Sequence, residues 1–388
     1  GDRVAVQVGK SPGALAIYAA CVQRGLVFLP LNPAYTAAEV AYFLTDSGAS
    51  LLICDAAAAG TPLVPLAADG TSSLHRLTDA ANAPIVDCGP QDLAAILYTS
   101  GTTGRSKGAM LTHANLLSNA QSLCEVWQIT KADVLLHALP IFHTHGLFVA
   151  MNTSLLAGGR VIFLPKLDID DLIRLMPQAT VMMGVPTFYT RLLADPRLTR
   201  DLVAHMRLFI SGSAPLLAQT HAEFSTRTGH RILERYGMTE TSMITSNPLL
   251  GQRLAGSVGF ALPGVEVRIT DPGTDTVLPA GETGMIEVRG PNVFAGYWNM
   301  PEKTAEEMRA DGFFLTGDLG LMDPRGYLHI VGRQKDLIIS GGYNIYPKEI
   351  ELLLDAQPEV LESAVVGLPH PDFGEAVAAF VVAAPGNP

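Results

Sequence analysis

A segment rich in glycine, serine and threonine follows the apolar stretch Leu93–Tyr98 and has the composition of a phosphate-binding loop. Glycine allows several backbone N–H groups to converge on an anion, and hydroxyl groups add further donors. Lys107, near the end of the segment, adds a compact positive charge. We therefore expect phosphate to bind at Thr99, Ser100, Gly101, Thr102, Thr103, Gly104 and Lys107.

The spacing in this loop excludes a Walker A motif, in which an adjacent Gly-Lys pair is followed by serine or threonine. Here Lys107 follows Ser106 and precedes Gly108. A flexible loop that binds no ligand is the alternative interpretation. The apolar run Ala109–Leu111 argues against it, because the loop then lies between two segments that are both expected to be buried.

Residues further along the chain could serve the rest of a nucleotide. Tyr236 offers an aromatic face to adenine, and Thr239 offers a hydroxyl group to a phosphate. Glu240 is the kind of oxygen ligand that Mg²⁺ uses together with substrate phosphates. Asp318 can accept hydrogen bonds from both ribose hydroxyl groups, and Arg333 can donate to the ribose. Core packing, a solvated carboxylate and a surface ion pair are the corresponding interpretations without a ligand.

The loop and these residues lie in five motifs that resemble the signature segments of the adenylate-forming superfamily. This superfamily includes acyl- and aryl-CoA synthetases, luciferases and the adenylation domains of peptide synthetases. The motifs occupy residues 98–108, 211–215, 234–240, 316–318, and 332–336 together with 341–351. The resemblance implies an ATP site that also includes Ser211, Gly212, Ser213, Ala214, Glu234, Arg235, Tyr236, Gly237, Met238, Thr239, Asp318 and Arg333.

The resemblance also implies a reaction in two steps. A carboxylic acid attacks the α-phosphorus of ATP to give acyl-AMP and pyrophosphate, and the thiol of coenzyme A then displaces AMP. Thr239 and Glu240, the latter as the Mg²⁺ ligand, would act in the first step. Lys335 would be the hinge of a rotating C-terminal lid, and Gly341 and Gly342 would line the pantetheine tunnel. The chain ends before the loop that carries the family's adenylation lysine, so we expect an incomplete lid and poor adenylation.

The identity of the acid is predicted from the segment Leu139–Gly146 and its surroundings, which are similar to malonyl-CoA synthetases. His143 occupies the position of the family's acyl-site histidine and counts as catalytic and acid-binding, whereas His145 is additional. A dicarboxylate such as malonate would bury a second charge, which is costly without a cationic partner. We expect Arg253 to be that partner. A zinc site is not indicated, because the histidines lack a third ligand at a typical spacing.

Several alternatives remain open at this point. The acid could be methylmalonate, acetate, or a longer fatty or aryl acid. A peptide-synthetase adenylation domain would need an aspartate for the α-ammonium group close before Ser211, and Asp195 and Asp201 lie too far away. A nucleotide-binding regulator without catalysis is the reading from a different functional class. The presence of Glu240 and Asp318 argues against it.

The elements that must position these residues alternate between strand and helix in the first part of the chain. Capping signals at Ser11-Pro12 and Thr36–Glu39 begin two helices, which implies a parallel sheet covered by helices. After Gly264, turns rich in glycine, proline and aspartate indicate antiparallel strands. The predicted fold is α/β, with a large domain over residues 1–334 and a partial α+β lid over residues 335–388. The large domain combines mixed or parallel sheets with a distorted antiparallel sheet.

Composition limits the possible partners and location. The formal net charge of −11 argues against nucleic acid as a partner, because phosphate backbones require a basic face. No stretch is long and apolar enough to span a membrane. The four cysteines lack CxxC spacing, which is typical of thiols in a reducing compartment and predicts a cytoplasmic protein. The oligomeric state is not predicted.

Overall fold

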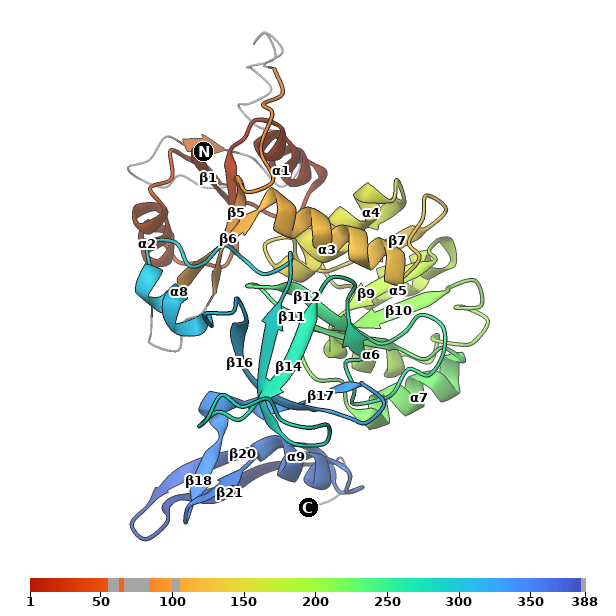
Figure 1. Cartoon of the computed structure of the whole chain (residues 1–388). Coiled ribbons are helices and arrows are strands. Elements are labelled where there is room, and N and C mark those ends of the chain that lie inside the picture. Colours follow the sequence, from red (N-terminus) through yellow and green to blue (C-terminus); the bar gives the residue numbers. More distant parts are fainter. Residues whose placement is uncertain (55–62, 66–83, 100–104, 385–388) are drawn as a thin grey trace.

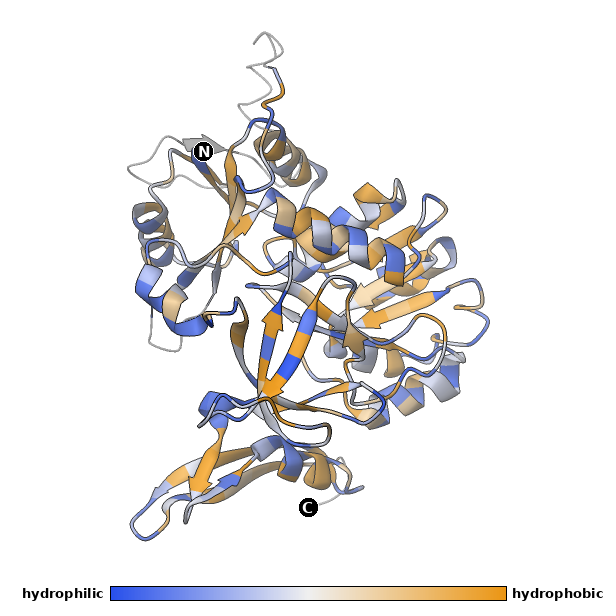
Figure 2. Cartoon of the chain, in the orientation of Figure 1, coloured by the Kyte–Doolittle hydropathy of each residue, from blue (hydrophilic) through white to orange (hydrophobic). Residues whose placement is uncertain are grey.

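The computed structural model describes residues 1–54, 63–65, 84–99 and 105–384. Four β-sheets follow one another along the chain, and helices cover the first two (Figure 1). Figure 2 shows that the strands of these sheets are predominantly apolar, while the helices carry polar residues on their outer faces. The expected α/β architecture is confirmed.

The N-terminal sheet has six strands in the order β4-β3-β1-β2-β5-β6, all parallel except for the last pair. Ser11 and Thr36 cap the two helices as predicted, and Thr36 forms a complete capping box with Glu39. The strands are β1 (Arg3–Gln7), β2 (Val27–Pro30), β3 (Leu51–Cys54), β4 (Leu63–Pro65), β5 (Leu93–Thr99) and β6 (Lys107–Thr112), with helices α1 (Pro12–Gln23) and α2 (Ala37–Ser47).

The middle sheet has seven strands in the order β13-β12-β11-β10-β9-β7-β8 and contains the largest part of the core. The strands are β7 (Val134–His137), β8 (Arg160–Phe163), β9 (Val181–Gly184), β10 (Leu208–Ser211), β11 (Leu233–Met238), β12 (Ser242–Ser246) and β13 (Phe260–Ala261). Its helices are α3 (His113–Val126), α4 (Asn152–Leu156), α5 (Ile169–Leu175), α6 (Pro186–Leu193) and α7 (Ala218–Thr228), with a π-helix, η2 (His145–Met151), and a 3₁₀-helix, η3 (Met176–Gln178).

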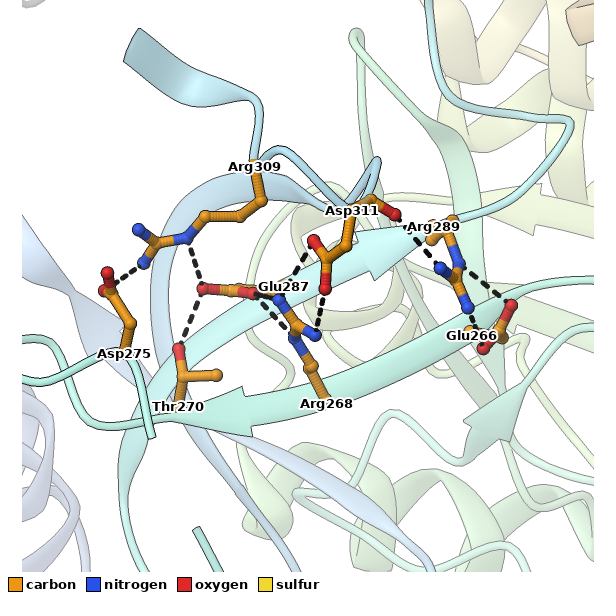
Figure 3. Close-up of polar contacts among 8 residues, drawn as sticks. All are labelled: Glu266, Arg268, Thr270, Asp275, Glu287, Arg289, Arg309 and Asp311. Carbon is orange, nitrogen blue, oxygen red and sulfur yellow. Dashed lines mark hydrogen bonds and ion pairs between the residues drawn. The ribbon is translucent and has the colours of Figure 1, made fainter. Parts of the chain in front are cut away.

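The third sheet is antiparallel, as the turns rich in glycine, proline and aspartate after Gly264 predicted. Its strands are β14 (Glu266–Thr270), β15 (Gly284–Arg289), β16 (Phe314–Met322) and β17 (Leu328–Arg333), and helix α8 (Pro301–Glu307) precedes β16. Glu287 on β15 is fully buried and accepts hydrogen bonds from Arg268, Arg309 and Thr270 (Figure 3). This network ties the chain that follows α8 to the sheet.

The C-terminal sheet follows the short 3₁₀-helix η4 (Gln334–Asp336) and has the strand order β19-β18-β21-β20. Its elements are β18 (Ile338–Ser340), β19 (Tyr343–Ile345), α9 (Pro347–Asp355), β20 (Val360–His370) and β21 (Gly374–Ala383). Helix α9 and these four strands agree with the α+β character predicted for residues 335–388. Within the described residues, no helix is long and apolar enough to cross a membrane.

Candidate active site

A cavity of about 810 Å³ brings together residues from all the predicted motifs that lie before the C-terminal sheet. It is lined from the N-terminal sheet by Thr99 and Lys107, and from the segment after β7 by Leu139, Pro140, His143, Thr144, His145 and Gly146. Strand β11 and the turn after it contribute Arg235, Gly237, Met238, Thr239 and Glu240. Further parts of the wall come from Tyr297, α8, β16 and residues 333–335, and from the single residues Val185, Ser213, Met243 and Met285.

The phosphate-loop prediction is tested only at its two ends. Thr99 ends β5, Lys107 begins β6, and both reach the cavity because these strands pair side by side. The Nζ atom of Lys107 lies 3.2 Å from Oε1 of Glu307 and 4.1 Å from the centre of the Tyr297 ring. The other predicted phosphate ligands, residues 100–104, lie outside the described residues.

Glu240 provides a buried carboxylate in the same cavity. Its exposed fraction is 5%, and the Tyr297 hydroxyl donates to Oε1 at 3.0 Å. Burial raises the pKa of Glu240, although the Tyr297 hydroxyl and the nearby Lys107 charge oppose this shift. Among the described residues, Glu240 makes no ion pair with a basic side chain. A buried carboxylate without a basic partner, near a lysine suited to phosphate, fits a magnesium ion that shares its coordination with a nucleotide.

Asp318, which we expected to bind the ribose, does not itself line the cavity, although its neighbours Thr316 and Gly317 do. Asp318 lies on β16 and is 4% exposed, and it accepts from the Tyr236 hydroxyl and from Nε of Arg333 at 2.9 Å. Burial raises the pKa of Asp318, and the Arg333 charge opposes this shift. Arg333, Gln334 and Lys335 line the cavity, whereas Tyr236 packs against the main core and is not among the lining residues. Its use as a stacking face for adenine stays a prediction.

Arg235 is the most unusual residue of the cavity wall. It is 3% exposed, and its Nε and Nη2 atoms have no hydrogen-bond partner among the described residues. Burial lowers its pKa to about 9. The backbone of Gly212 lies so close that a Cβ there would meet the guanidinium carbon at 2.4 Å. An uncompensated buried guanidinium that faces a cavity is suited to an anionic ligand.

Two histidines lie beside this guanidinium along the segment that follows β7. His143 lines the cavity with much of its surface exposed, while His145 is 5% exposed. Nδ1 of His145 lies 3.2 Å from the hydroxyl oxygen of Ser213, and its Nε2 has no partner among the described residues. Burial, together with the Arg235 charge, lowers the pKa of His145 well below its usual value, so His145 is neutral near pH 7. The segment therefore carries one accessible and one buried histidine.

Arg253 does not line the cavity, although we expected it to bind the acid there. Its guanidinium donates to the backbone carbonyl oxygens of Arg231, Leu249 and Pro248, at 2.6, 2.9 and 3.3 Å, and it does not line the cavity. The position of Arg253 between two motifs did not predict its location, because the loop folds so that the guanidinium meets backbone carbonyl groups and not the cavity. Arg253 therefore braces a loop.

Other predicted residues also lie away from the cavity wall. Gly341 and Gly342 form the tight turn between β18 and β19 with φ values of 58° and 84°, which favour glycine. Neither lines the cavity. Ser211, Gly212 and Glu234 are buried next to it, and Ala214 is exposed. Ser213 does reach the cavity, with a φ of 71° that turns the chain sharply after β10.

Comparison with known families agrees with this geometry. The family described as AMP-binding enzyme matches residues 1–298, and the AMP-binding enzyme C-terminal domain matches residues 349–388. The chain belongs to the AMP-binding enzyme family. The first match includes the phosphate loop, both cavity histidines and Glu240, and the second includes most of α9 and the long strands of the C-terminal sheet.

Individual proteins similar to this chain include enzymes whose names refer to malonate or malonyl-CoA. The solved structure of ATP-bound MatB from Rhodopseudomonas palustris has a TM-score of 0.96 at 60% identity, over 100% of this chain and 79% of that one. A malonyl-CoA ligase with methylmalonyl-CoA and AMP bound has a TM-score of 0.77 at 39% identity, over 100% and 84%. The malonate–CoA ligase of Arabidopsis thaliana is 39% identical over 395 residues, 92% of this chain. The chain spans 64% of the length of that relative.

Among the cavity residues that we did not predict are Tyr297, Lys303 and Glu307. Tyr297 joins Glu240 and Glu307 through its hydroxyl oxygen, at 3.0 and 2.7 Å, and Lys303 lies 3.0 Å from Glu307. Pro301 marks the start of α8, so the helix itself could have been predicted. Nothing in the sequence indicates that this helix meets the phosphate loop, because the contact spans about half of the chain.

Proposed function

We propose that this protein is an ATP-dependent acid–CoA ligase that activates malonate as an acyl-adenylate and transfers it to coenzyme A. The observation that carries the proposal is the buried guanidinium of Arg235, of which Nε and Nη2 have no partner among the described residues, in a cavity that Lys107 and Glu240 also line. The similarity to ATP-bound MatB and to two ligases named for malonate or malonyl-CoA supports it. The role of each residue in the two reaction steps depends on this function.

In the first step, one malonate carboxylate oxygen bonds to the α-phosphorus of ATP and the bond to pyrophosphate breaks. Lys107 is suited to the negative charge that develops on the leaving phosphates, and Glu240 to holding Mg²⁺, which would supply electrostatic stabilisation there. Arg333 and Asp318 are suited to fixing the ribose, so that the α-phosphorus meets the acid in a defined position.

In the second step, the thiol of coenzyme A loses its proton and its sulfur attacks the acyl carbon. AMP leaves as the new thioester forms, with the electron pair on its phosphate oxygen. His143 is accessible in the cavity wall and is suited to the passage between acid and thiol. Lys335, which also lines the cavity, precedes the C-terminal sheet, and we propose that it is the hinge about which residues 335–388 turn as a lid between the steps.

In this proposal Arg235, and not Arg253 as expected from the sequence, pairs with the second carboxylate of malonate. The second carboxylate of malonate needs a cation because an unpaired buried charge costs several kcal/mol. Arg235 is buried and lines the cavity, and two of its guanidinium nitrogens have no hydrogen-bond partner among the described residues. The guanidinium of Arg253, in contrast, donates to three backbone carbonyl oxygens. A monocarboxylate would leave the guanidinium uncompensated, so the site selects against acetate and simple fatty acids.

The first experiment measures malonate-dependent AMP release by the full-length protein in the presence of ATP, Mg²⁺ and coenzyme A. Malonate, methylmalonate, acetate, octanoate and coumarate are compared at equal concentration. We expect malonate to give the highest kcat/KM, with methylmalonate next because it keeps both carboxylates. A higher kcat/KM for a monocarboxylate would refute the dicarboxylate assignment but retain the ligase. No AMP from any acid would favour the regulator instead.

The second experiment compares Arg235→Met with Arg253→Met. We expect Arg235→Met to lower kcat/KM for malonate by about a hundredfold or more, since breaking a buried ion pair costs roughly 2–5 kcal/mol. The same variant should unfold at a higher urea concentration without ligand, because it removes an uncompensated buried charge. Arg253→Met should retain most malonate activity. The reverse ranking of the two variants would restore Arg253 to the acid site.

A further inference from the structure

Helix α8 places a carboxylate directly on the lysine expected to bind phosphate. Oε1 of Glu307 lies 3.2 Å from Nζ of Lys107, and the two side chains are 21% and 12% exposed. The pair is therefore largely shielded from water, so salt screens it less than a surface pair. Lys107 is occupied by an anion that belongs to the protein itself.

Glu307 is held in this position from several directions. The Tyr297 hydroxyl lies 2.7 Å from its Oε2 atom, and Lys303 lies 3.0 Å from Oε1. Two residues after the end of α8, Arg309 is bound to the fully buried Glu287 on β15 (Figure 3). The end of α8 is thus anchored to the antiparallel sheet, and the contact with Lys107 does not depend on a loosely held side chain.

The partners of the two cavity carboxylates distinguish their roles. Glu240 is buried and, among the described residues, contacts no basic side chain, which leaves it suited to a metal. Glu307 contacts Lys107 and Lys303 on one oxygen and a phenol on the other. To become a metal ligand it would have to give up these partners, so its environment is that of a counterion.

We propose that Glu307 is an internal substitute for nucleotide phosphate, which holds Lys107 in the empty site and releases it when the polyphosphate of ATP binds. Binding then exchanges one anion for another on the same amine, and Lys107 is never left without a partner. After adenylation, the carboxylate can retake the amine as pyrophosphate leaves. The proposal rests on the proposed function in one respect only, namely that the cavity binds ATP.

The test measures the dissociation constants of ATP and AMP by calorimetry in EDTA, so that metal coordination does not contribute. Glu307→Gln keeps the shape of the side chain and removes the competing charge. We expect it to bind ATP about threefold to tenfold more tightly than the wild type, while AMP affinity stays the same because AMP lacks the β- and γ-phosphates. Inorganic pyrophosphate should follow ATP.

Two controls isolate the exchange at Lys107. Glu302→Gln removes the same charge from the first turn of α8, at an exposed side chain that does not line the cavity, and should change ATP affinity by less than about twofold. In a Lys107→Met background, Glu307→Gln should no longer tighten ATP binding, because the amine for which the two anions compete is gone. Thermal unfolding of each variant confirms that it is folded.

The outcomes separate this proposal from the function on which it rests. Unchanged or weaker ATP binding by Glu307→Gln overturns the proposal, as does equal tightening by Glu302→Gln or tightening that survives without Lys107. In each of these cases wild-type ATP binding leaves the proposed function intact. If the wild type binds no ATP in either the presence or the absence of Mg²⁺, both proposals fail together.

Discussion

Glu234 shows how one residue of a predicted nucleotide motif can matter for stability. It is 6% exposed, and its Oε1 atom accepts from the Gly256 backbone N–H at 3.1 Å. Burial raises its pKa from 4.5 to about 8. The folded chain therefore binds this proton more tightly than the unfolded chain, and the stability contributed by protonated Glu234 is lost as the pH rises from about 4.5 to 8.

A Glu234→Gln variant should remove this pH dependence. Between pH 5.5 and pH 8 we expect the wild type to lose roughly 2–4 kcal/mol of unfolding free energy through this group, and the variant to lose less by that amount. Urea unfolding at both pH values measures the difference. Parallel pH profiles of the two proteins would show that Glu234 is ionised in the folded state.

At the same scale, the sequence identifies residue types better than their partners. Lys107, Glu240 and Thr239 were predicted and do line one cavity, because they belong to motifs whose chemistry is local. The role of Arg253 could not be judged from the sequence, since it depends on three backbone carbonyls supplied by the fold around it. The role of Arg235 could not be judged either, since it depends on two guanidinium nitrogens that have no hydrogen-bond partner in the part of the chain that the structure describes.

At the scale of elements, the antiparallel sheet depends on the buried carboxylate of Glu287 (Figure 3). Replacing Glu287 by Gln leaves Arg268 and Arg309, about three quarters buried, without a shared counterion. We expect a loss of about 2–4 kcal/mol of unfolding free energy. Glu266→Gln is the matched control, because its pair with Arg289 is 61% and 43% exposed and should contribute less than about 1 kcal/mol. Equal losses in urea unfolding would contradict the difference in burial.

Elements with strong local signals were predicted well. Helices α1 and α2 begin at the predicted capping signals, because Ser11 and Thr36 act on neighbouring backbone groups. The pairing of β11 with β12 was not predicted. The motif over residues 234–240 reads as a binding segment, and its extended form is imposed by strands on both sides.

At the scale of the whole molecule, the proposed hinge can be separated from the chemistry. Lys335→Pro fixes φ near −65°, whereas Lys335→Ala keeps backbone freedom and removes the charge. We expect the proline variant to retain malonate-dependent ATP–pyrophosphate exchange and to lose thioester formation by about tenfold or more, since a hinge must change its dihedral angles. The alanine variant should retain the second step. Equal loss of both steps in the proline variant would show that no rotation about Lys335 is needed.

Contacts between distant parts of the chain were the hardest feature to predict from the sequence. The sequence predicted a large α/β domain and a partial lid, but the meeting of α8 with the start of β6 brings together Glu307 and Lys107 from opposite halves of the chain. No local pattern encodes such a contact. The domain boundary at residues 334–335 and the cytoplasmic location remain predictions.

The π-helix His145–Met151 also affects the direction in which a buried cavity histidine points. It continues directly into α4, so the two form one helix whose first seven residues are wound more widely than the rest. Such a wide turn is what an α-helix becomes when it gains one residue. Deleting that residue would restore α geometry and rotate His145 by roughly 100° relative to α4, away from Ser213. The wide winding of this helix therefore contributes to the orientation that holds the buried His145 beside Ser213.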